Sequence, residues 1–439
     1  MTRHYTPDNV AELLSKHAPR ELTSLLDPAV GSGVLIRPLL ERCRKQSATV
    51  VCVDSDAEAL AELRSTLDNK TAKQAQFVNA DFLEWAASEC SQPRHREFDC
   101  VVMNPPFSAQ KSGYTWISSQ AYCPGSSLRT RSVPVETAFV LRAVEMLRPG
   151  GRLLAILPGS IVMSESSQWL REHLLRVGAI HYVRELPRRT FREVESRFYL
   201  FIFQKTGRQR VITLCNHDLA GRERLYVAKS ELGPSLRLDY GFHDSRQELQ
   251  ALVEAGGMEW QLLKECASLF RGTEKSPDGV DYSIHTCDYR NGFWRRASRH
   301  REPAAAGDTC VQKGDILVKR VSRNCSQSFG RGLGIIGMPC SDCVIVIRPN
   351  RQRSSSRLLF ALRCLSTLEA TRTKIESGTG AAYVTLNELL TLRVPIGIDR
   401  RFPRLFKTFC EALRRKNGRK LAAVERSAHR FLLKRGGSG

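Results

Sequence analysis

One amide, two prolines and one aromatic ring stand together in Asn104-Pro105-Pro106-Phe107, directly after the apolar run that ends at Met103. Two prolines hold φ at about −65° and continue neither strand nor helix, which favours a rigid turn at a strand end. The Asn104 side-chain oxygen and the Pro105 carbonyl can each accept one hydrogen of a planar amino group. Two such bonds favour a pyramidal nitrogen with an available lone pair, and Phe107 offers a face for a stacked base. We favour this chemistry, group transfer to a planar amino nitrogen, over an ordinary loop turn.

A second motif, Asp27-Pro28-Ala29-Val30-Gly31-Ser32-Gly33, also follows an apolar run. Glycines let a backbone turn tightly and approach a ligand closely. The spacing is not that of a dinucleotide loop and no phosphate-binding lysine is present, which disfavours nicotinamide cofactors and ATP. Asp27 instead places a carboxylate where the ammonium of S-adenosylmethionine could bind. Taken alone, a plain turn is the better explanation of this loop.

Acidic residues follow the next two apolar runs. Asp54 comes after the run 50–53, where an acid commonly binds ribose hydroxyls. In Asn79-Ala80-Asp81-Phe82, Asp81 can accept a hydrogen bond from an adenine amino group and Phe82 can cover the ring. Each residue has a structural alternative, namely a solvated acid, a helix N-cap and a core side chain. Their order along the chain favours one nucleoside site.

Short apolar runs alternate with helical patterns over residues 1–205 and predict the elements that position these motifs. Such alternation is typical of a parallel, doubly wound sheet, whose ligands bind beyond the carboxyl ends of the strands. Residues 108–135 break the pattern and predict a long loop. The predicted strands are 22–26, 50–53, 77–78, 99–103, 152–157 and 198–203, and the predicted helices are 35–43, 56–67 and 136–147.

The net charge of +22 is concentrated in one half of the chain. Residues 1–205 hold 26 Lys and Arg against 22 Asp and Glu, a balance of +4, whereas residues 206–439 hold 41 against 23, a balance of +18. A basic domain attracts phosphate polyanions because each neutralised phosphate releases counterions. The asymmetry favours a nucleic acid partner over a merely solubilising surface.

The 14 cysteines are scattered, unlike those of a small secreted disulfide scaffold. Cys340-Ser341-Asp342-Cys343 has zinc-knuckle spacing, but no second pair completes four ligands, so we expect buried thiols and no metal. No apolar run approaches the roughly 20 residues that span a bilayer, and no apolar signal segment follows Met1. We therefore expect a soluble, cytoplasmic protein without a membrane partner.

Together, the motifs of residues 5–205 resemble those of the N6-adenine DNA methyltransferase family, in the order of its gamma class. Asn104, Pro105, Pro106 and Phe107 match its catalytic motif. Phe191 resembles the aromatic residue that packs on the other face of a flipped base, and Phe198 and Tyr199 are alternatives whose strand-like setting favours the core. The cofactor-binding residues that the resemblance implies are Tyr5, Thr6, Pro7, Asp27, Ala29, Gly31, Gly33, Asp54, Asp81 and Phe82.

The region 258–400 resembles one target-recognition domain of Type I restriction specificity subunits. The similarity lies in the segments 267–272, 313–320, 377–380, 384–389 and 392–396. Basic residues there, Lys319 and Arg320 among them, would read guanines or hold phosphates, with a solvated strand edge as an equal alternative. The stretch 402–433 predicts a basic amphipathic helix or helical pair, either a spacer or dimer surface or a helix packed on its own domain.

The sequence therefore predicts a Rossmann-like α/β S-adenosylmethionine-dependent methyltransferase domain (1–205), a connecting region (206–257), an α+β DNA target-recognition domain (258–400) and a basic helix with a flexible tail (401–439). The resemblance implies methyl transfer to N6 of adenine in double-stranded DNA, within a restriction–modification or defence system with a partner subunit, and leaves the oligomeric state open. The alternatives are an RNA or protein nitrogen methyltransferase of the same fold and an inactive DNA-binding relative.

Overall fold

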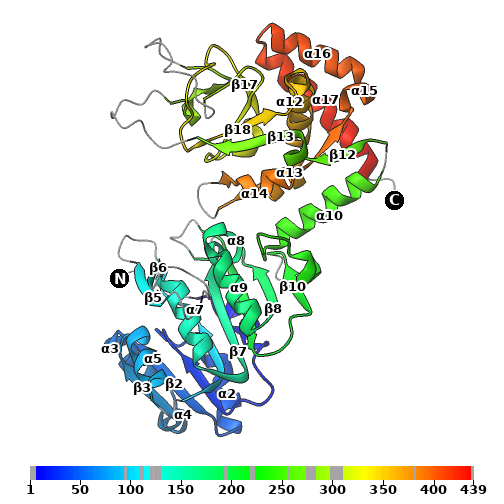
Figure 1. Cartoon of the computed structure of the whole chain (residues 1–439). Helices are drawn as coiled ribbons and strands as arrows, with labels where there is room; N and C mark the ends of the chain where they lie inside the picture. The colour runs from blue at the N-terminus through cyan, green and yellow to red at the C-terminus, as the bar shows by residue number, and fades with distance from the viewer. Residues whose placement is uncertain are drawn as a thin grey trace. The chain divides into compact units, whose positions relative to one another are not determined.

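The chain divides into two compact units, residues 1–240 and 241–439, which are described separately (Figure 1). No helix in the described part of the chain is long and apolar enough to cross a membrane. The computed structural model describes residues 6–92, 96–107, 113–118, 122, 130–188, 190–191, 196–217, 223–255, 257–272, 283–296, 310–378 and 382–436.

A nine-stranded sheet forms the centre of the first unit, in the order β11-β10-β8-β9-β7-β4-β1-β2-β3. The five strands from β3 to β7 run parallel. β9 is antiparallel to both β7 and β8, β10 is parallel to β8, and β11 is antiparallel to β10. The strands are β1 (Ser24–Asp27), β2 (Thr49–Asp54), β3 (Ala75–Asn79), β4 (Phe98–Met103), β7 (Leu147–Pro158), β8 (Gly178–Glu185), β9 (Phe198–Lys205), β10 (Val211–Cys215) and β11 (Arg224–Ala228).

Helices cover both faces of this sheet, as predicted for a Rossmann-like domain. Along β4, Val101 and Met103 enter the core beneath α5, α7, α8 and α9, whereas Cys100 and Val102 enter the core beneath α1, α2 and α3. Burial on both faces explains why the strands read as continuous apolar runs. The helices are α1 (Asp8–Ser15), α2 (Arg37–Lys45), α3 (Ala57–Thr66), α4 (Asn69–Gln74), α5 (Phe82–Cys90), α7 (Val135–Glu145), α8 (Gly159–Met163) and α9 (Gln168–Val177), with 3-10 turns at Glu165–Ser167 and Lys229–Glu231.

Every predicted strand and helix of this unit is present at its predicted place, but three regions differ from the prediction. The predicted loop 108–135 contains an antiparallel hairpin of β5 (Tyr114–Ser118) and β6 (Thr130–Pro134). Strand β8 was not predicted. The predicted connecting region 206–257 is divided between the two units. β10 and β11 extend the sheet of the first unit, and the boundary along the chain falls between Tyr240 and Gly241.

Asp99 joins the amino ends of β1 and β4 through a network of hydrogen bonds. Its Oδ2 accepts from Thr23 N (2.5 Å), Thr23 Oγ1 (2.7 Å) and Ser24 N (3.0 Å), and its Oδ1 pairs with Arg148 Nε. Burial alone would raise the pKa of this carboxyl group, but the bonds from Thr23 and Arg148 outweigh burial and lower the pKa. The network fixes the register of the two strands whose opposite ends carry Asp27 and Asn104.

The second unit is an α+β domain, in keeping with the predicted class. Its six-stranded sheet has the order β13-β18-β16-β17-β15-β14, and the pairs β12–β21 and β19–β20 lie apart from it. The strands are β12 (Glu259–Leu262), β13 (Ala267–Arg271), β14 (Tyr289–Arg290), β15 (Phe293–Trp294), β16 (Ile316–Lys319), β17 (Gly330–Gly332), β18 (Val344–Pro349), β19 (Glu376–Ser377), β20 (Tyr383–Val384) and β21 (Arg393–Ile396).

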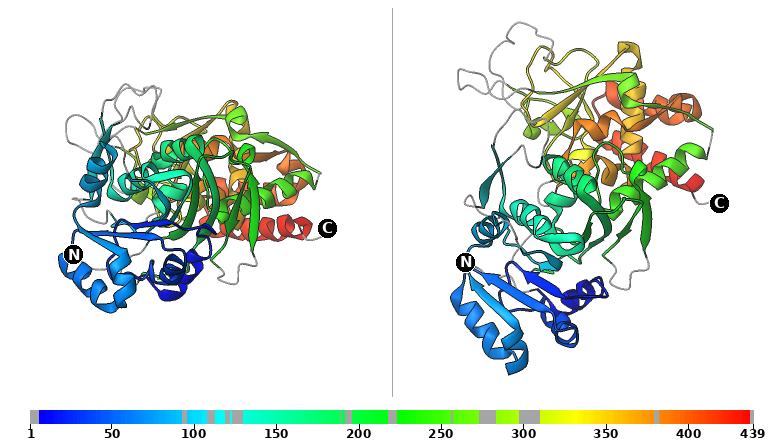
Figure 2. Two further views of the ribbon diagram at one scale, coloured as in Figure 1. Left: turned by 90° about the horizontal axis from the view of Figure 1, so that it is seen from below. Right: turned by 60° about the horizontal axis from the view of Figure 1, so that its bottom comes forward.

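The helices of the second unit pack on one apolar core that includes Phe360 and Phe409, whose ring centres lie 5.1 Å apart. α16 and α17 lie side by side and both contact α12 (Figure 2), so the helical pair, packed on its own domain, is present. Residues 437–439 of the predicted flexible tail lie outside the described residues. The helices are α10 (Tyr240–Glu254), α11 (Leu263–Cys266), α12 (Ser355–Leu365), α13 (Glu369–Ile375), α14 (Leu386–Leu390), α15 (Ile398–Arg401), α16 (Pro403–Arg414) and α17 (Gly418–Gly436), with 3-10 turns at Thr286–Asp288, Cys325–Gln327 and Gln352–Ser354.

We predict that Asp99→Asn lowers the free energy of unfolding by about 2 kcal/mol at pH 7, because it weakens several charge-assisted hydrogen bonds at once. The folded-state pKa lies below 3.8, so the charged carboxylate stabilises the fold above pH 3.8 and this stability is lost as the pH falls through the folded pKa. Urea unfolding at pH 7 and below pH 4 should therefore show the difference narrowing in acid. Glu62→Gln, on the exposed face of α3, is the control; an equal loss in both variants would contradict the role of the network.

Candidate active site

Four polar residues end or follow four neighbouring parallel strands of the first unit. Asp27 ends β1, Asp54 ends β2, Asp81 follows β3 by two residues, and Asn104 follows β4 directly. The strands lie in the order β4-β1-β2-β3, so these residues share the carboxyl edge of the sheet. This is the edge at which ligands bind in such sheets.

Asp27 is 1% exposed and only one of its oxygens is satisfied within the described part of the chain. Oδ1 accepts from Ala29 N at 3.2 Å, whereas Oδ2 is buried without a hydrogen-bond partner. Burial raises the pKa of this carboxyl group to about 8. A buried acceptor that lacks a partner is costly, and a bound ammonium group would satisfy it. Asp27 therefore fits the cation that the sequence predicted there.

Gly31 and Gly33 are required for different reasons. Both have positive φ, at 48° and 76°, a conformation that glycine adopts readily. A Cβ on Gly33 would overlap Leu63 of α3, so this glycine allows helix and loop to pack. A Cβ on Gly31 would meet no atom within 4 Å, so the backbone there is open to a ligand.

Asp54 holds the glycine loop in place. Its Oδ2 accepts from Gly31 N at 2.8 Å and its Oδ1 from Asp56 N at 2.9 Å. Gly33 N donates to Val30 O at 2.8 Å and closes the turn. These bonds give Asp54 a structural role that sequence reasoning missed, and its predicted contact with ribose stays a prediction.

Asp81 and Phe82 occupy the first turn of α5 in the roles that the sequence offered as structural alternatives. Asp81 caps the helix, since its Oδ1 accepts from Leu83 N (2.8 Å) and Glu84 N (3.1 Å). Phe82 is 2% exposed and its ring centre lies 5.0 Å from that of Phe139. The cap and the core explain both residue types, and the predicted adenine contacts stay predictions.

Asn104 presents a single oriented oxygen. Its Nδ2 donates to Thr6 Oγ1 at 3.0 Å, while its Oδ1 is buried without a partner among the described residues. Thr6 is itself 8% exposed, and the following Pro7 caps α1 through its carbonyl oxygen, which accepts from Val10 N at 3.0 Å. The bond from Asn104 to Thr6 was not foreseen, because the sequence placed Thr6 against the cofactor. Tyr5, predicted beside it, lies outside the described residues.

Phe107, Phe191 and Phe198 form an aromatic cluster beside this motif. The ring centres are 4.7 Å apart for Phe107 and Phe198, 4.6 Å for Phe191 and Phe198, and 6.1 Å for Phe107 and Phe191. A base between two parallel rings needs about 7 Å, twice the roughly 3.5 Å contact distance. The structure therefore brings the two predicted stacking residues together with the rings in mutual contact, and Phe198 joins them although its strand setting favoured the core alone.

In the second unit, the two cations that the sequence singled out have partners within the domain. Arg320 Nε donates to Asp342 O at 2.7 Å, and its Nη2 lies 3.3 Å from Asp342 Oδ2. Lys319 Nζ lies 5.4 Å from the centre of the Tyr289 ring. Arg320 thus pins β16 to the loop before β18, which is a structural role.

The Cys340–Cys343 segment lies next to this network. Cys340 is 1% exposed and burial raises the pKa of its thiol to about 12. No cluster of three or more His, Cys, Asp or Glu side chains able to hold a metal occurs within the described ranges.

Comparison with known proteins places the chain in a family. The family model described as N-6 DNA Methylase matches residues 1–224. The modification methylase CviBIII of Paramecium bursaria Chlorella virus NC1A is 23% identical over 214 residues, which are 48% of this chain and 51% of that protein. The chain thus spans about half the length of this relative.

Two solved structures are similar to the chain at low sequence identity. A type I restriction-modification system methyltransferase subunit from Streptococcus thermophilus has a TM-score of 0.38 and 23% identity, over 48% of this chain and 47% of that one. The type IIG restriction endonuclease BpuSI has a TM-score of 0.45 and 14% identity, over 99% of this chain and 66% of that one.

Because the family model matches more than half of the 439 residues, the chain belongs to the N-6 DNA methylase family.

Proposed function

We propose that this protein transfers a methyl group from S-adenosylmethionine to N6 of adenine in double-stranded DNA, within a restriction–modification or defence system with a partner subunit. One observation carries the proposal: two buried acceptor oxygens without partners in the described chain, Asp27 Oδ2 and Asn104 Oδ1, lie at the same sheet edge. One suits a cofactor ammonium and the other a substrate amino group. The family supports this reaction, and the modification methylase relative supports the biological setting.

The first acceptor and its loop suit the cofactor. Asp27 Oδ2 would accept hydrogen bonds from the ammonium group, and the open backbone at Gly31 would allow close approach. Bound S-adenosylmethionine would supply an electrophilic methyl group. Asp54 would bind the ribose and Asp81 the adenine. Each carboxylate would use the lone pairs that do not already accept backbone hydrogen bonds from the glycine loop or from α5.

The second acceptor suits the substrate amino group. Asn104 Oδ1 would accept one amino hydrogen, and the bond from Asn104 Nδ2 to Thr6 keeps the amide in the required orientation. The Pro105 carbonyl would accept the other hydrogen, so that the nitrogen becomes pyramidal and its lone pair can attack. Phe107 and Phe191 would separate to hold the flipped base between them.

The basic second half supports DNA as the carrier of this adenine. The balance of +18 beyond residue 205 suits a phosphate polyanion, and the α+β second unit has the class of a target-recognition domain. An RNA or protein nitrogen methyltransferase would use the same acceptor at Asn104, so substrate choice has to be measured directly. An inactive DNA-binding relative would bind DNA without transferring methyl groups.

Purified protein with labelled S-adenosylmethionine should place label on N6 of adenine in mixed-sequence duplex DNA. Asn104→Ala should lower this transfer roughly 100-fold or more, because the loss falls on an interaction that the reaction uses directly. Cofactor affinity should stay within about twofold of the wild type. Label in tRNA or protein with none in DNA would replace the proposal by the first alternative. Full transfer in Asn104→Ala, with Asn69→Ala as an exposed control, would remove Asn104 from the mechanism.

Asp27→Asn should weaken S-adenosylmethionine binding roughly tenfold to hundredfold, the loss expected for a charge-assisted hydrogen bond. For the wild type, affinity should rise as the pH approaches about 8, since the carboxyl group must lose its proton to pair with ammonium. Titration calorimetry from pH 6 to 9 would measure both effects. A pH-independent wild-type affinity, or an unaffected variant, would contradict the assignment.

The same substitution should have the opposite effect on the stability of the cofactor-free protein. The folded pKa of about 8 exceeds the usual 3.8, so wild-type stability falls as the pH rises from about 4 to about 8, where the unfolded chain has released a proton that the folded chain keeps. Asp27→Asn lacks this loss and should gain stability relative to the wild type over that range. Urea unfolding at pH 6 and pH 8.5 tests the sign, with Glu62→Gln, on the exposed face of α3, as the control.

Phe107→Ala should lower kcat/KM for DNA about 5-fold to 100-fold, because one stacked base contributes roughly 1–3 kcal/mol. Phe107→Trp keeps an aromatic face and should recover most of the loss. Steady-state methylation kinetics would measure both variants, with thermal unfolding to check that the packing against Phe198 survives. Wild-type kinetics in the alanine variant, or no recovery with tryptophan in a folded variant, would argue against stacking on Phe107.

A further inference from the structure

A polar cavity of about 720 Å³ lies in the second unit. One wall is the turn between β14 and β15, with Arg290, Asn291 and Arg295, and the other is the junction of α16 and α17, residues 415–419. Six of its nine lining residues are Arg or Lys, and none is acidic or aromatic. The cavity therefore concentrates positive charge and offers no aromatic ring on which a nucleobase could stack.

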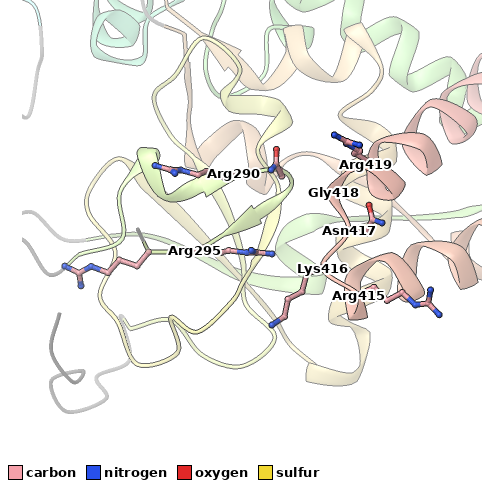
Figure 3. A pocket seen from close by; sticks show the side chains of 9 residues that line it. Arg290, Arg295, Arg415, Lys416, Asn417, Gly418 and Arg419 are labelled. Carbon is pink, nitrogen blue, oxygen red and sulfur yellow. The ribbon is translucent and has the colours of Figure 1, made fainter. Parts of the chain in front are cut away.

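Five of the six cations of this cavity have no acidic partner among the described residues. Arg290, Arg295, Arg415, Lys416 and Arg419 are exposed, and none of them forms an ion pair with an acid among the described residues. In Figure 3, Arg295 extends from the hairpin side toward the Lys416–Gly418 loop, whereas Arg415 points away from it. Like charges held together repel one another, so an anion bound between them would relieve that repulsion.

The two walls are held together before any ligand binds. A Cβ on Gly418 would overlap the backbone of Asn291, so only glycine allows this close approach. Arg363 donates to Gly292 O at 3.2 Å and Phe329 O at 2.8 Å and pairs with Glu425 of α17, which ties the turn to the helix. The cavity is thus a fixed feature of the domain.

Each wall of the cavity contains a non-glycine residue with positive φ. Asn291 and Lys416, one from each wall, have φ of 51° and 52°. Asn291 and Gly292 form the two-residue turn of the β14–β15 hairpin, and Lys416 follows the end of α16, and both are places where this conformation is common. At the start of α17, Asn417 Oδ1 accepts from Lys420 N at 3.0 Å and fixes the loop beside the helix.

We propose that this cavity binds the phosphodiester backbone of the DNA substrate. The inference rests on the proposed function and adds a phosphate-holding site to it, with Arg295, Lys416 and Arg419 as the principal contacts. Uncompensated cations suit phosphates, and the lining offers no aromatic ring for a base to stack on. We assign the site to phosphate contacts, which position a duplex on a protein.

The test compares two variants with the same change in net charge. The cavity variant is Arg295→Gln/Lys416→Gln/Arg419→Gln, and the control is Arg401→Gln/Arg404→Gln/Lys407→Gln, at exposed positions outside the cavity. Affinity for a fluorescein-labelled 30-bp duplex of mixed sequence is measured against NaCl concentration. Each lost phosphate contact lowers the slope of log K against log [salt] by about 0.9, so the cavity variant should lose about 2 to 3 and the control less than about 1.

Each outcome supports or overturns the inference. An unchanged slope in the cavity variant, or an equal loss in the control, overturns it. Saturable binding of inorganic phosphate, lost in the cavity variant while the DNA slope is unchanged, would assign the cavity to a free anion; the same pattern with polyglutamate would assign it to an acidic protein. If the wild-type protein methylates DNA and the cavity variant keeps the wild-type salt dependence of DNA affinity, only the proposed phosphate site is refuted. If the wild-type protein transfers no methyl group to DNA and the salt dependence of DNA affinity is reduced in the cavity variant, only the proposed reaction is refuted.

Discussion

Two buried oxygens, on Asp27 and Asn104, are left without hydrogen-bond partners in the described chain, and this constraint governs the first unit. Each such acceptor costs about 1–3 kcal/mol, and the burial of Asp27 raises the pKa of its carboxyl group to about 8. The fold sustains that cost because β1 and β4 are neighbours in the middle of a sheet packed on both faces. A cofactor ammonium group that donates to Asp27 and a substrate amino group that donates to Asn104 would each recover part of this cost, so the buried acceptors favour the binding of both.

Hydrogen bonds of the neighbouring residues leave the two acceptor oxygens without partners among the described residues. Gly31 N donates a hydrogen bond to Asp54 and is therefore not available to Asp27. The backbone at Gly31 stays open to a ligand. Asn104 Nδ2 donates to Thr6 Oγ1, which fixes the orientation of the amide and leaves its oxygen as a free acceptor among the described residues. Several of these residues serve the architecture first and the ligand second, which is why their types alone suggested either role.

The sequence predicted what depends on local pattern and missed what depends on distant contacts. Apolar strands such as β4 and the turns after them were predicted because burial on both faces leaves a continuous apolar run. β10 has exposed Val211 at its start and half-buried Thr213 between its buried residues, which gives a weaker signal, and it was assigned to a connecting region. The bond between Thr6 and Asn104 joins residues 98 positions apart, and no local pattern predicts it. Arg320 read as a ligand-binding cation because its partner, Asp342, becomes a neighbour only when β16 pairs with β18.

The cations of the second unit fall into two groups, one paired with acids and one without acidic partners among the described residues. This difference decides which cations can attract a polyanion. Arg271, Arg320, Arg348 and Arg363 are paired with acids and stabilise the fold, so they add little to the field that a polyanion meets. The cations at the α16–α17 junction have no such acids among the described residues, and the close packing of Gly418 on Asn291 fixes their loop to the hairpin. A balance of +18 over the whole half predicts attraction to a polyanion, whereas only the unpaired subset can release counterions on binding. The first unit, with a balance of only +4 up to residue 205, would rely instead on two buried acceptor oxygens for its chemistry, so attraction and reaction would be divided between different parts of the chain.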